Sequence, residues 1–309
     1  MKKLHNIILS LSLVFLSVVS ASCQRAATPA VDENKPTIVV TFSVMGAVVS
    51  DLVGDQANVI VPIPNGQDLH DWEPSARDIE TMTNADLIVQ NGLELEGGMD
   101  KALAQAQEAG VEIFTASDHI AVRIVSAGEG IPSGDPDQAV GAQDPHLWMD
   151  PIAIKQVVIA LTEVLKNDLG LDVSERALDL ENRLDELDQS ISQKVSSIPA
   201  DQRKLVTGHE SMGYFADRYG FKVIGAIVPS LSSQAEVSAS ELSALKSLIE
   251  EQGVTAIFTE LGTPPAVAEA IGEETGVKVV TLSTHTLPED GSYFTFMTEL
   301  CDTIINAYK

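Results

Sequence analysis

Histidines in four separate segments are the side chains of this 309-residue chain best suited to chemistry. Five of the six histidines follow residue 22, and four of those five lie in segments that also carry acidic or aromatic residues. The four segments are 65–74, 144–151, 208–215 and 285–293. Imidazole nitrogen suits Zn(II), whereas carboxylate oxygen adds negative charge and fits harder ions. Three histidines and one carboxylate would complete a tetrahedral metal site.

The candidate ligands are His70, His146, His209 and Asp290. They lie far apart in the sequence, so no local spacing marks a metal site, and hydrogen-bonded surface histidines are the alternative. His119 follows a predicted strand without an accompanying motif, which favours a structural or surface role.

Short apolar runs rich in β-branched residues alternate with segments of helical period, and eight of these runs are predicted to be strands. They are 37–42, 58–62, 86–90 and 112–114 in the first half, and 204–207, 222–227, 256–259 and 277–282 in the second. Four strands per half with helices between them predict an α/β fold of two parallel-sheet lobes. Such sheets bind ligands at the carboxyl ends of their strands, where several of the histidine segments stand.

One long helix is predicted between the two lobes. Apolar residues recur at 3-4 spacing over 174–198 without Pro or Gly, with Ser174 as a suitable N-cap and Pro199 as the stop. Such a helix would be about 37 Å long and rather rigid. The predicted domains are an N-terminal lobe over 37–172, a connecting helix over 173–199 and a C-terminal lobe over 200–309. Residues 126–143, rich in Gly and Pro, are expected to form an exposed loop.

The N-terminus has the pattern of an export signal. Two lysines precede an apolar run, and small residues stand directly before Cys23. Residues 1–22 are therefore a predicted signal peptide, and 23–36 a flexible tether. The junction resembles a bacterial lipobox, although Ser20 replaces the usual Leu, so we expect a lipid on Cys23. Simple cleavage near Ser22, with pairing of Cys23 and Cys301, is the alternative.

Composition excludes several classes of function. The chain has 19 Lys and Arg against 45 Asp and Glu, a formal charge of −26, which argues against binding nucleic acid. With 44% hydrophobic and 21% charged residues it is expected to be globular. Two cysteines are too few for a Cys-rich zinc site, and no stretch beyond the signal is apolar enough to predict an integral membrane domain.

The histidine segments resemble motifs of the zinc- and manganese-receptor family of ABC importers, the cluster A-I metal-binding lipoproteins. Residues 66–74 (GQDLHDWEP) resemble the motif G-x-D-P-H-x-aromatic-E-P, with Leu69 in place of Pro, and residues 144–151 (DPHLWMDP) resemble the second motif. Residues 209–215 (HESMGYF) resemble the third, in which zinc-type members have His and manganese-type members usually have Glu. His209 therefore favours zinc.

The closing motif of the family resembles residues 290–293 (DGSY), but Asp290 stands three residues before Tyr293 rather than the commoner two. His285, Glu260 and a water are the alternatives to Asp290 as fourth ligand. Acidic residues beside the motifs, namely Asp68, Glu73, Asp144 and Asp150, are candidate acceptors for ligand N–H groups, with solvated loop acids as the alternative. Trp72 and Trp148 would shield the site.

The resemblance implies a monomeric, extracytoplasmic receptor, periplasmic or anchored to the membrane through Cys23. It would hold Zn(II) between two lobes joined by a rigid helix and deliver the ion to an ABC permease, with a periplasmic metallochaperone as an optional further partner. Mn(II) is the alternative cargo, and a surface adhesin is the alternative role. An enzyme is not expected, because the register around Ser211 does not fit G-x-S-x-G and four ligands would leave no position for a catalytic water. A zinc hydrolase using Glu210 as base is the remaining alternative.

Overall fold

The computed structural model describes residues 32–126, 129–130 and 139–309. The predicted signal peptide, Cys23 with its expected lipid, and most of the tether lie outside the described residues. The chain divides into two compact units, residues 1–34 and 35–309, and the fold below is that of the second. None of its described helices is both long and apolar enough to cross a membrane.

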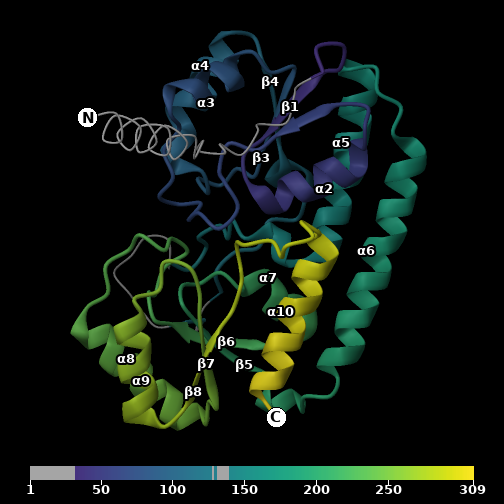
Figure 1. The fold of residues 1–309 in the computed structure, drawn as a ribbon. Coiled ribbons are helices and arrows are strands. Elements are labelled where there is room, and N and C mark those ends of the chain that lie inside the picture. The colour runs from purple at the N-terminus through teal and green to yellow at the C-terminus, as the bar shows by residue number, and fades with distance from the viewer. Residues whose placement is uncertain (1–31, 127–128, 131–138) are drawn as a thin grey trace, which may run out of the picture. The chain divides into compact units, whose positions relative to one another are not determined.

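The first half of this unit contains one four-stranded parallel sheet, drawn at the top of Figure 1. Its strands, in the order β2-β1-β3-β4, are β1 (Thr37–Val40), β2 (Asn58–Ile60), β3 (Leu87–Gln90) and β4 (Glu112–Thr115). The central strands are almost entirely buried, as expected for apolar β-branched runs covered on both faces. The accompanying helices are α2 (Ser43–Val53), α3 (Ala76–Thr83), α4 (Asp100–Glu108) and α5 (Pro151–Asp168).

The second half contains two parallel strand pairs, β5-β6 and β7-β8, and β5 also lies beside β7. The strands are β5 (Lys204–Thr207), β6 (Lys222–Ala226), β7 (Ala256–Thr259) and β8 (Lys278–Thr281). The helices are α7 (Gly213–Tyr219), α8 (Ala239–Gln252), α9 (Pro265–Thr275) and α10 (Tyr293–Ala307). All eight predicted strands are present, and every strand end lies within two residues of its predicted position. The predicted α/β class with parallel sheets is confirmed.

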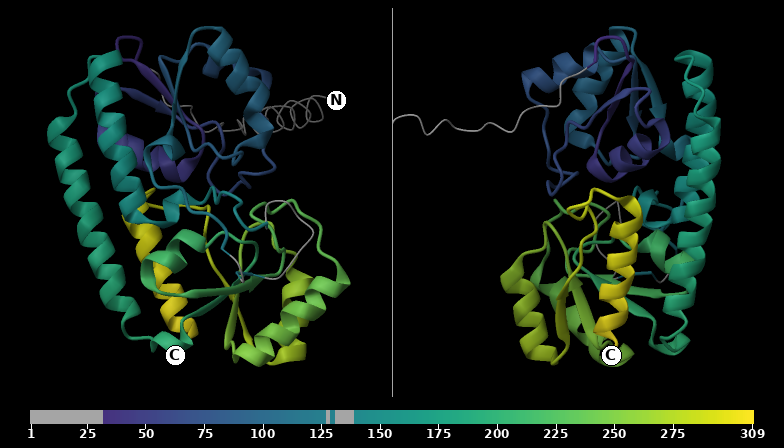
Figure 2. Two further views of the ribbon diagram at one scale, coloured as in Figure 1. Left: turned by 180° about the vertical axis from the view of Figure 1, so that it is seen from behind. Right: turned by 45° about the vertical axis from the view of Figure 1, so that its right-hand side comes forward.

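Helix α6 (Ser174–Val195) runs beside elements of both halves. It packs on α5 and α2 in the first half and on α7 and α10 in the second (Figure 2). Its 22 residues span about 33 Å. The predicted start differs slightly, because Ser174 is the first helical residue and the Asp172 carboxylate accepts hydrogen bonds from its N–H and hydroxyl. The helix ends at Val195, three residues before the predicted end at Ile198.

Basic side chains at the amino ends of the second-half strands bind the carboxyl ends of helices. Lys278 Nζ donates to the carbonyl of Ala307 at the end of α10, over 3.0 Å, and Lys204 Nζ donates to the carbonyl of Gln252 at the end of α8. Positive charge at a helix carboxyl end is favourable, because the last carbonyls carry partial negative charge. These lysines fix the helices against the strand ends opposite the histidine segments.

Candidate metal centre

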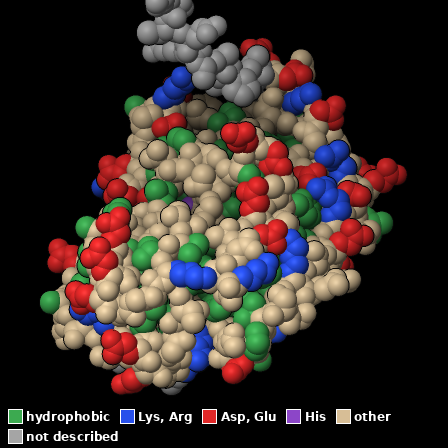
Figure 3. Space-filling view, turned by 60° about the horizontal axis from the view of Figure 1, so that its bottom comes forward, with side chains coloured by type: hydrophobic (Ala, Val, Ile, Leu, Met, Phe, Trp, Pro, Cys, Tyr) green, Lys and Arg blue, Asp and Glu red, His purple; other side chains and the backbone are tan. Residues whose placement is uncertain are grey.

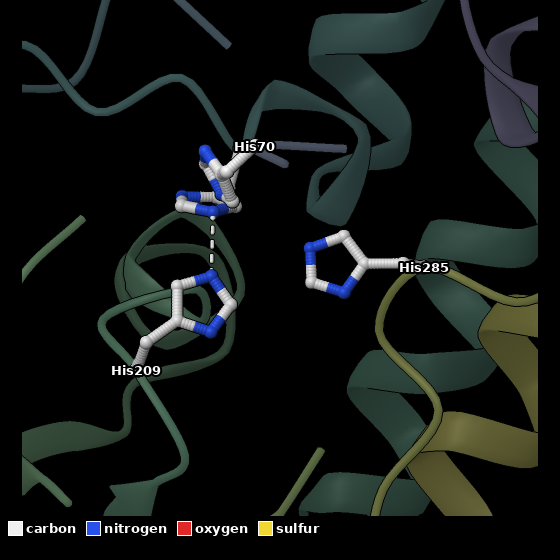
Figure 4. A group of neighbouring side chains, drawn as sticks. His70, His209 and His285 are labelled. Carbon is white, nitrogen blue, oxygen red and sulfur yellow. Dashed lines mark hydrogen bonds between the residues drawn. The ribbon is translucent and has the colours of Figure 1, made fainter. Parts of the chain in front are cut away.

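Four histidines converge where the loops of the two halves meet (Figure 4). One potential ligand nitrogen from each of His70, His146, His209 and His285 lies within 4.8 Å of the others. His70 lies in the loop after β2, His146 directly before α5 and its preceding 3₁₀ turn, His209 after β5, and His285 after β8. The last three are buried and His70 is half-buried.

Three of these imidazoles are oriented by an acceptor at Nδ1. His146 Nδ1 lies 2.8 Å from Asp144 Oδ1, and His209 Nδ1 lies 3.2 Å from Glu260 Oε1. His285 Nδ1 lies 2.8 Å from the hydroxyl of Thr284, whose single proton is donated to Glu260. That hydroxyl must therefore accept from His285 Nδ1–H. In the neutral form of each of these three rings, the proton on Nδ1 leaves Nε2 with a free lone pair.

The Nε2 atoms of His146 and His209 face one another, as the dashed line in Figure 4 shows. Nε2 of His146 and Nε2 of His209 are 3.1 Å apart, and among the described residues the buried Nε2 atoms of His70 and His285 have no hydrogen-bond partner. Two facing lone pairs repel unless a proton or a metal ion lies between them. A tetrahedral Zn(II) with Zn–N bonds near 2.05 Å would place its nitrogens about 3.3 Å apart, close to this spacing.

Burial and mutual repulsion keep most of the cluster neutral. Burial lowers the pKa of His70, with repulsion from the other histidines adding to the effect, and burial also lowers the pKa of His146. Burial and the neighbouring His209 lower the pKa of His285 to about 3. Burial acts in the same direction on His209, but the Glu260 carboxylate overcomes it and raises the pKa of His209. His209 is therefore the member of the cluster that most readily takes up a second proton, which would lie on Nε2 facing His146.

Glu260 is a buried carboxylate that organises the second half of the cluster. It accepts hydrogen bonds from the His209 N–H over 2.9 Å, from the Ser211 hydroxyl over 2.8 Å, and from Thr284. Burial alone would raise the pKa of Glu260, yet His209 and these hydrogen bonds hold it well below its usual range. Gly208 makes room for this arrangement, because a Cβ there would lie 2.6 Å from Glu260 Cγ.

The comparisons with known proteins place this architecture in a family. Residues 38–307 match the family described as "Zinc-uptake complex component A periplasmic". This chain belongs to that family. Its relatives include the zinc-binding protein TroA of Treponema pallidum, 28% identical with 89% of each chain covered. Another is the manganese ABC transporter substrate-binding lipoprotein PsaA of Streptococcus anginosus, 25% identical with 96% of each covered.

Solved structures of similar proteins agree with the fold. The structure of TroA superimposes with a TM-score of 0.73 at 26% identity, covering 88% of this chain and 99% of TroA. A mutant of the laminin-binding adhesin Lmb from Streptococcus agalactiae gives a TM-score of 0.75 at 25% identity, covering 88% of this chain and 99% of Lmb.

The structure does not bring Asp290 to the histidines, contrary to the expected ligand set. Its side chain is exposed, with Oδ1 accepting from the Ser292 N–H over 3.0 Å and Oδ2 accepting from the Thr295 hydroxyl over 2.6 Å. These bonds tie Asp290 to the first turn of α10. In this chain His285 is the fourth member of the cluster instead. Glu260 is linked to His285 through the Thr284 hydroxyl and also binds His209.

The other acidic candidates have separate roles. Asp144 accepts from His146 and from Arg123 Nη1, the latter over 3.2 Å, and Asp68 accepts from the His70 N–H over 3.0 Å. Asp150 caps α5 by accepting from the Ile152 N–H, and Glu73 is exposed. The expected acceptors near the ligands are therefore Asp144 and Asp68.

Of the two tryptophans and the remaining histidine, only Trp148 is shown to pack against a cluster histidine. Trp148 is fully buried, its ring centroid lies 5.3 Å from that of His146, and its Nε1–H donates to the carbonyl of Thr284. Trp72 is only partly buried. His119 lies outside the cluster and stacks on Phe114 with ring centroids 4.5 Å apart.

A cavity of about 470 Å³ borders the cluster on the side of His70. Its wall includes Pro145 and Leu231 from the two halves, together with Leu93 and Glu94. The last two are consecutive non-glycine residues with φ of 58° and 60°, in the left-handed region that such residues rarely adopt. His70 is thus the cluster histidine that stands on the cavity wall.

Proposed function

We propose that this chain is an extracytoplasmic receptor that captures Zn(II) with His70, His146, His209 and His285 and passes it to an ABC permease. One observation carries the proposal: a nitrogen from each of four imidazoles converges on one point. In three of these rings the other nitrogen, Nδ1, faces a hydrogen-bond acceptor that holds the ring proton there. Family membership supports uptake rather than catalysis, and the names of its relatives support a lipid anchor at Cys23.

The charge of the ion would be balanced from outside the shell of ligands. Asp144 and Glu260 each bind the Nδ1 side of a ligand imidazole, so two negative charges lie next to a doubly charged ion without contacting it. A shell of nitrogen ligands suits Zn(II) better than Mn(II), which prefers oxygen. The relatives include both zinc-binding and manganese-binding proteins, so they do not decide between the two metals. The nitrogen ligands are the reason to favour zinc here.

Four protein ligands support binding rather than hydrolysis. A catalytic zinc keeps an open position for water, whereas four imidazoles would fill a tetrahedral shell. The Ser211 hydroxyl donates to Glu260, and because the pKa of that carboxylate is held well below its usual range, Glu260 is a poor general base. The net charge of −26 would attract a divalent cation and disfavour an anionic partner, although Asp and Glu are interspersed with Lys and Arg on the face drawn in Figure 3.

The fourth ligand is tested by a matched pair of variants, His285→Ala and Asp290→Ala. Titration of the metal-stripped chain from residue 24 with Zn(II) and Mn(II) should show one tight zinc per chain. We expect His285→Ala to weaken zinc binding about 100-fold, as loss of one of four ligands should. Asp290→Ala should leave it unchanged, because that carboxylate serves the start of α10. Weakening by Asp290→Ala alone would contradict the assignment of His285.

Zinc binding should displace about one proton from the chain, and the affinity should depend on pH accordingly. The pKa values of His70, His146 and His285 are lowered, so these rings are already neutral at pH 7, whereas the pKa of His209 is raised. The affinity should therefore fall about ten-fold per pH unit below the pKa of His209, instead of with the fourth power of proton concentration. Calorimetry in buffers of different ionisation enthalpy measures this release. Displacement of three or four protons would contradict the lowered pKa values of His70, His146 and His285.

A further inference from the structure

The segment that carries His285, residues 282–292 between β8 and α10, is called here the His285 loop. Two buried contacts hold its first part. The Trp148 Nε1–H donates to the carbonyl of Thr284 over 2.9 Å, and the Thr284 hydroxyl donates to Glu260. Trp148, Thr284 and Glu260 are all buried.

A third contact holds the loop from its exposed side. Asn65 Nδ2 donates to the carbonyl of Leu287 over 3.0 Å, and Asn65 Oδ1 accepts from the Leu287 N–H over 2.8 Å. The amide thus binds both polar groups of one backbone residue, as a neighbouring strand would. We call this pair of hydrogen bonds the Asn65 clasp.

The Asn65 clasp joins the segments of two cluster histidines. Asn65 stands in the loop of His70, five residues before it, and Leu287 stands two residues after His285. The neighbouring Gly66, with φ of +82°, lies against Thr286, and a Cβ at Gly66 would be 3.7 Å from Thr286 Cγ2. The loops of His70 and His285 are therefore in contact beside the cluster.

We propose that Asn65 is a positioning residue that holds His285 against the other three histidines and so limits how fast a bound ion leaves. This inference rests on the proposed function. The buried contacts at Thr284 fix one point of the His285 loop, and the clasp fixes a second point three residues later. Since Asn65 is exposed, its hydrogen bonds compete with water and open more readily than the buried ones. Opening the clasp frees the loop to turn about Thr284 and withdraw His285.

The test compares zinc dissociation into excess chelator for the unmodified chain and Asn65→Ala. We expect Asn65→Ala to speed dissociation about ten-fold, the effect of losing the two exposed hydrogen bonds to Leu287 together with the 3.3 Å bond that Asn65 Oδ1 accepts from the Ser43 hydroxyl. Asn65→Asp keeps the acceptor for the Leu287 N–H but loses the donor, so a smaller increase is expected. Gln56→Ala is the matched control, because it removes another exposed long-range amide-to-carbonyl bond, at the opposite end of β2. It should leave dissociation unchanged.

Two further measurements separate positioning from general loosening. In a His285→Ala background, Asn65→Ala should have no additional effect, because the ligand through which it acts is gone. Co(II) bound to Asn65→Ala should absorb more weakly in the visible than Co(II) bound to the unmodified chain, since departure of an imidazole lets water enter and raises the coordination number.

If zinc left both Asn65 variants at the same rate as the unmodified chain, the positioning role of Asn65 would be wrong, while the proposed receptor function would stand. Equal acceleration by Asn65→Ala with and without His285 would overturn the positioning role too, because the effect would then be structural. Failure of the unmodified chain to bind one zinc would overturn the proposed function itself, and the clasp with it.

Discussion

Replacing His209 by alanine should lower the affinity for Zn(II) by about 100- to 1,000-fold, the share of one ligand in a four-ligand zinc site. His209 contributes more than a lone pair. Its Nδ1 binds Glu260, so the substitution also removes one partner of a buried carboxylate, while the backbone N–H of residue 209 remains. We therefore expect His209→Ala to have the largest effect of the single histidine substitutions.

A competition titration against a chromophoric chelator measures this loss, with stoichiometry read from the same curve. His119→Ala is the matched control, because it removes an imidazole that stacks on Phe114 outside the cluster. It should bind one zinc as tightly as the unmodified chain. Comparable affinity for His209→Ala would remove this residue from the site and leave the convergence of the four rings without a role.

The strands and three of the four converging histidines could be predicted from the sequence, because they depend on local patterns. Apolar β-branched runs such as those around Ile38 and Ile257 can be buried on both faces only as parallel strands between helices. His70, His146 and His209 each stand in a segment with a distinctive set of neighbours. For these residues the order of the chain carries enough information to indicate where the side chain lies.

The choice between Asp290 and His285 could not be made in this way, because the conformation of one loop decides it. Both residues lie between β8 and α10, five positions apart. Asp290 is drawn to the start of α10 by Ser292 and Thr295, while Thr284 and Trp148 hold the preceding turn inward. The unusual spacing from Asp290 to Tyr293 was the one signal in the sequence that this loop departs from the family pattern.

The sequence also does not reveal that Glu260 binds and orients His209; it offers Glu260 only as a candidate fourth ligand. Glu260 is 51 residues from His209 and follows a different strand, so no spacing connects the two. The residue that reveals the connection is Gly208, because any side chain there would meet Thr263 and Glu260. A glycine directly before a ligand histidine indicates close packing behind the ligand, but it does not identify the partner.

Glu260→Gln should weaken zinc binding by about 10- to 100-fold without removing any ligand, the range for changes to residues that support ligands. The amide keeps the size of the side chain but removes one of the two charges that would balance the ion. It also removes the cause of the raised pKa of His209, so burial should make that ring neutral at pH 7. The proton displaced by zinc should therefore largely disappear, and the weaker affinity should become nearly independent of pH between 6 and 8.

These two effects distinguish electrostatic support from simple packing. A packing defect would lower the affinity but leave one proton to be displaced, whereas loss of the Glu260 charge changes both quantities together. Glu274→Gln is the matched control, since Glu274 is a surface residue of the same half that pairs with Lys246. Unaltered proton release from Glu260→Gln would show that another group holds the proton. Because glutamine cannot carry that proton and burial disfavours it on His70, His146 and His285, the proton would have to lie on His209, held there by the charges of Asp68 and Glu210 and not by Glu260.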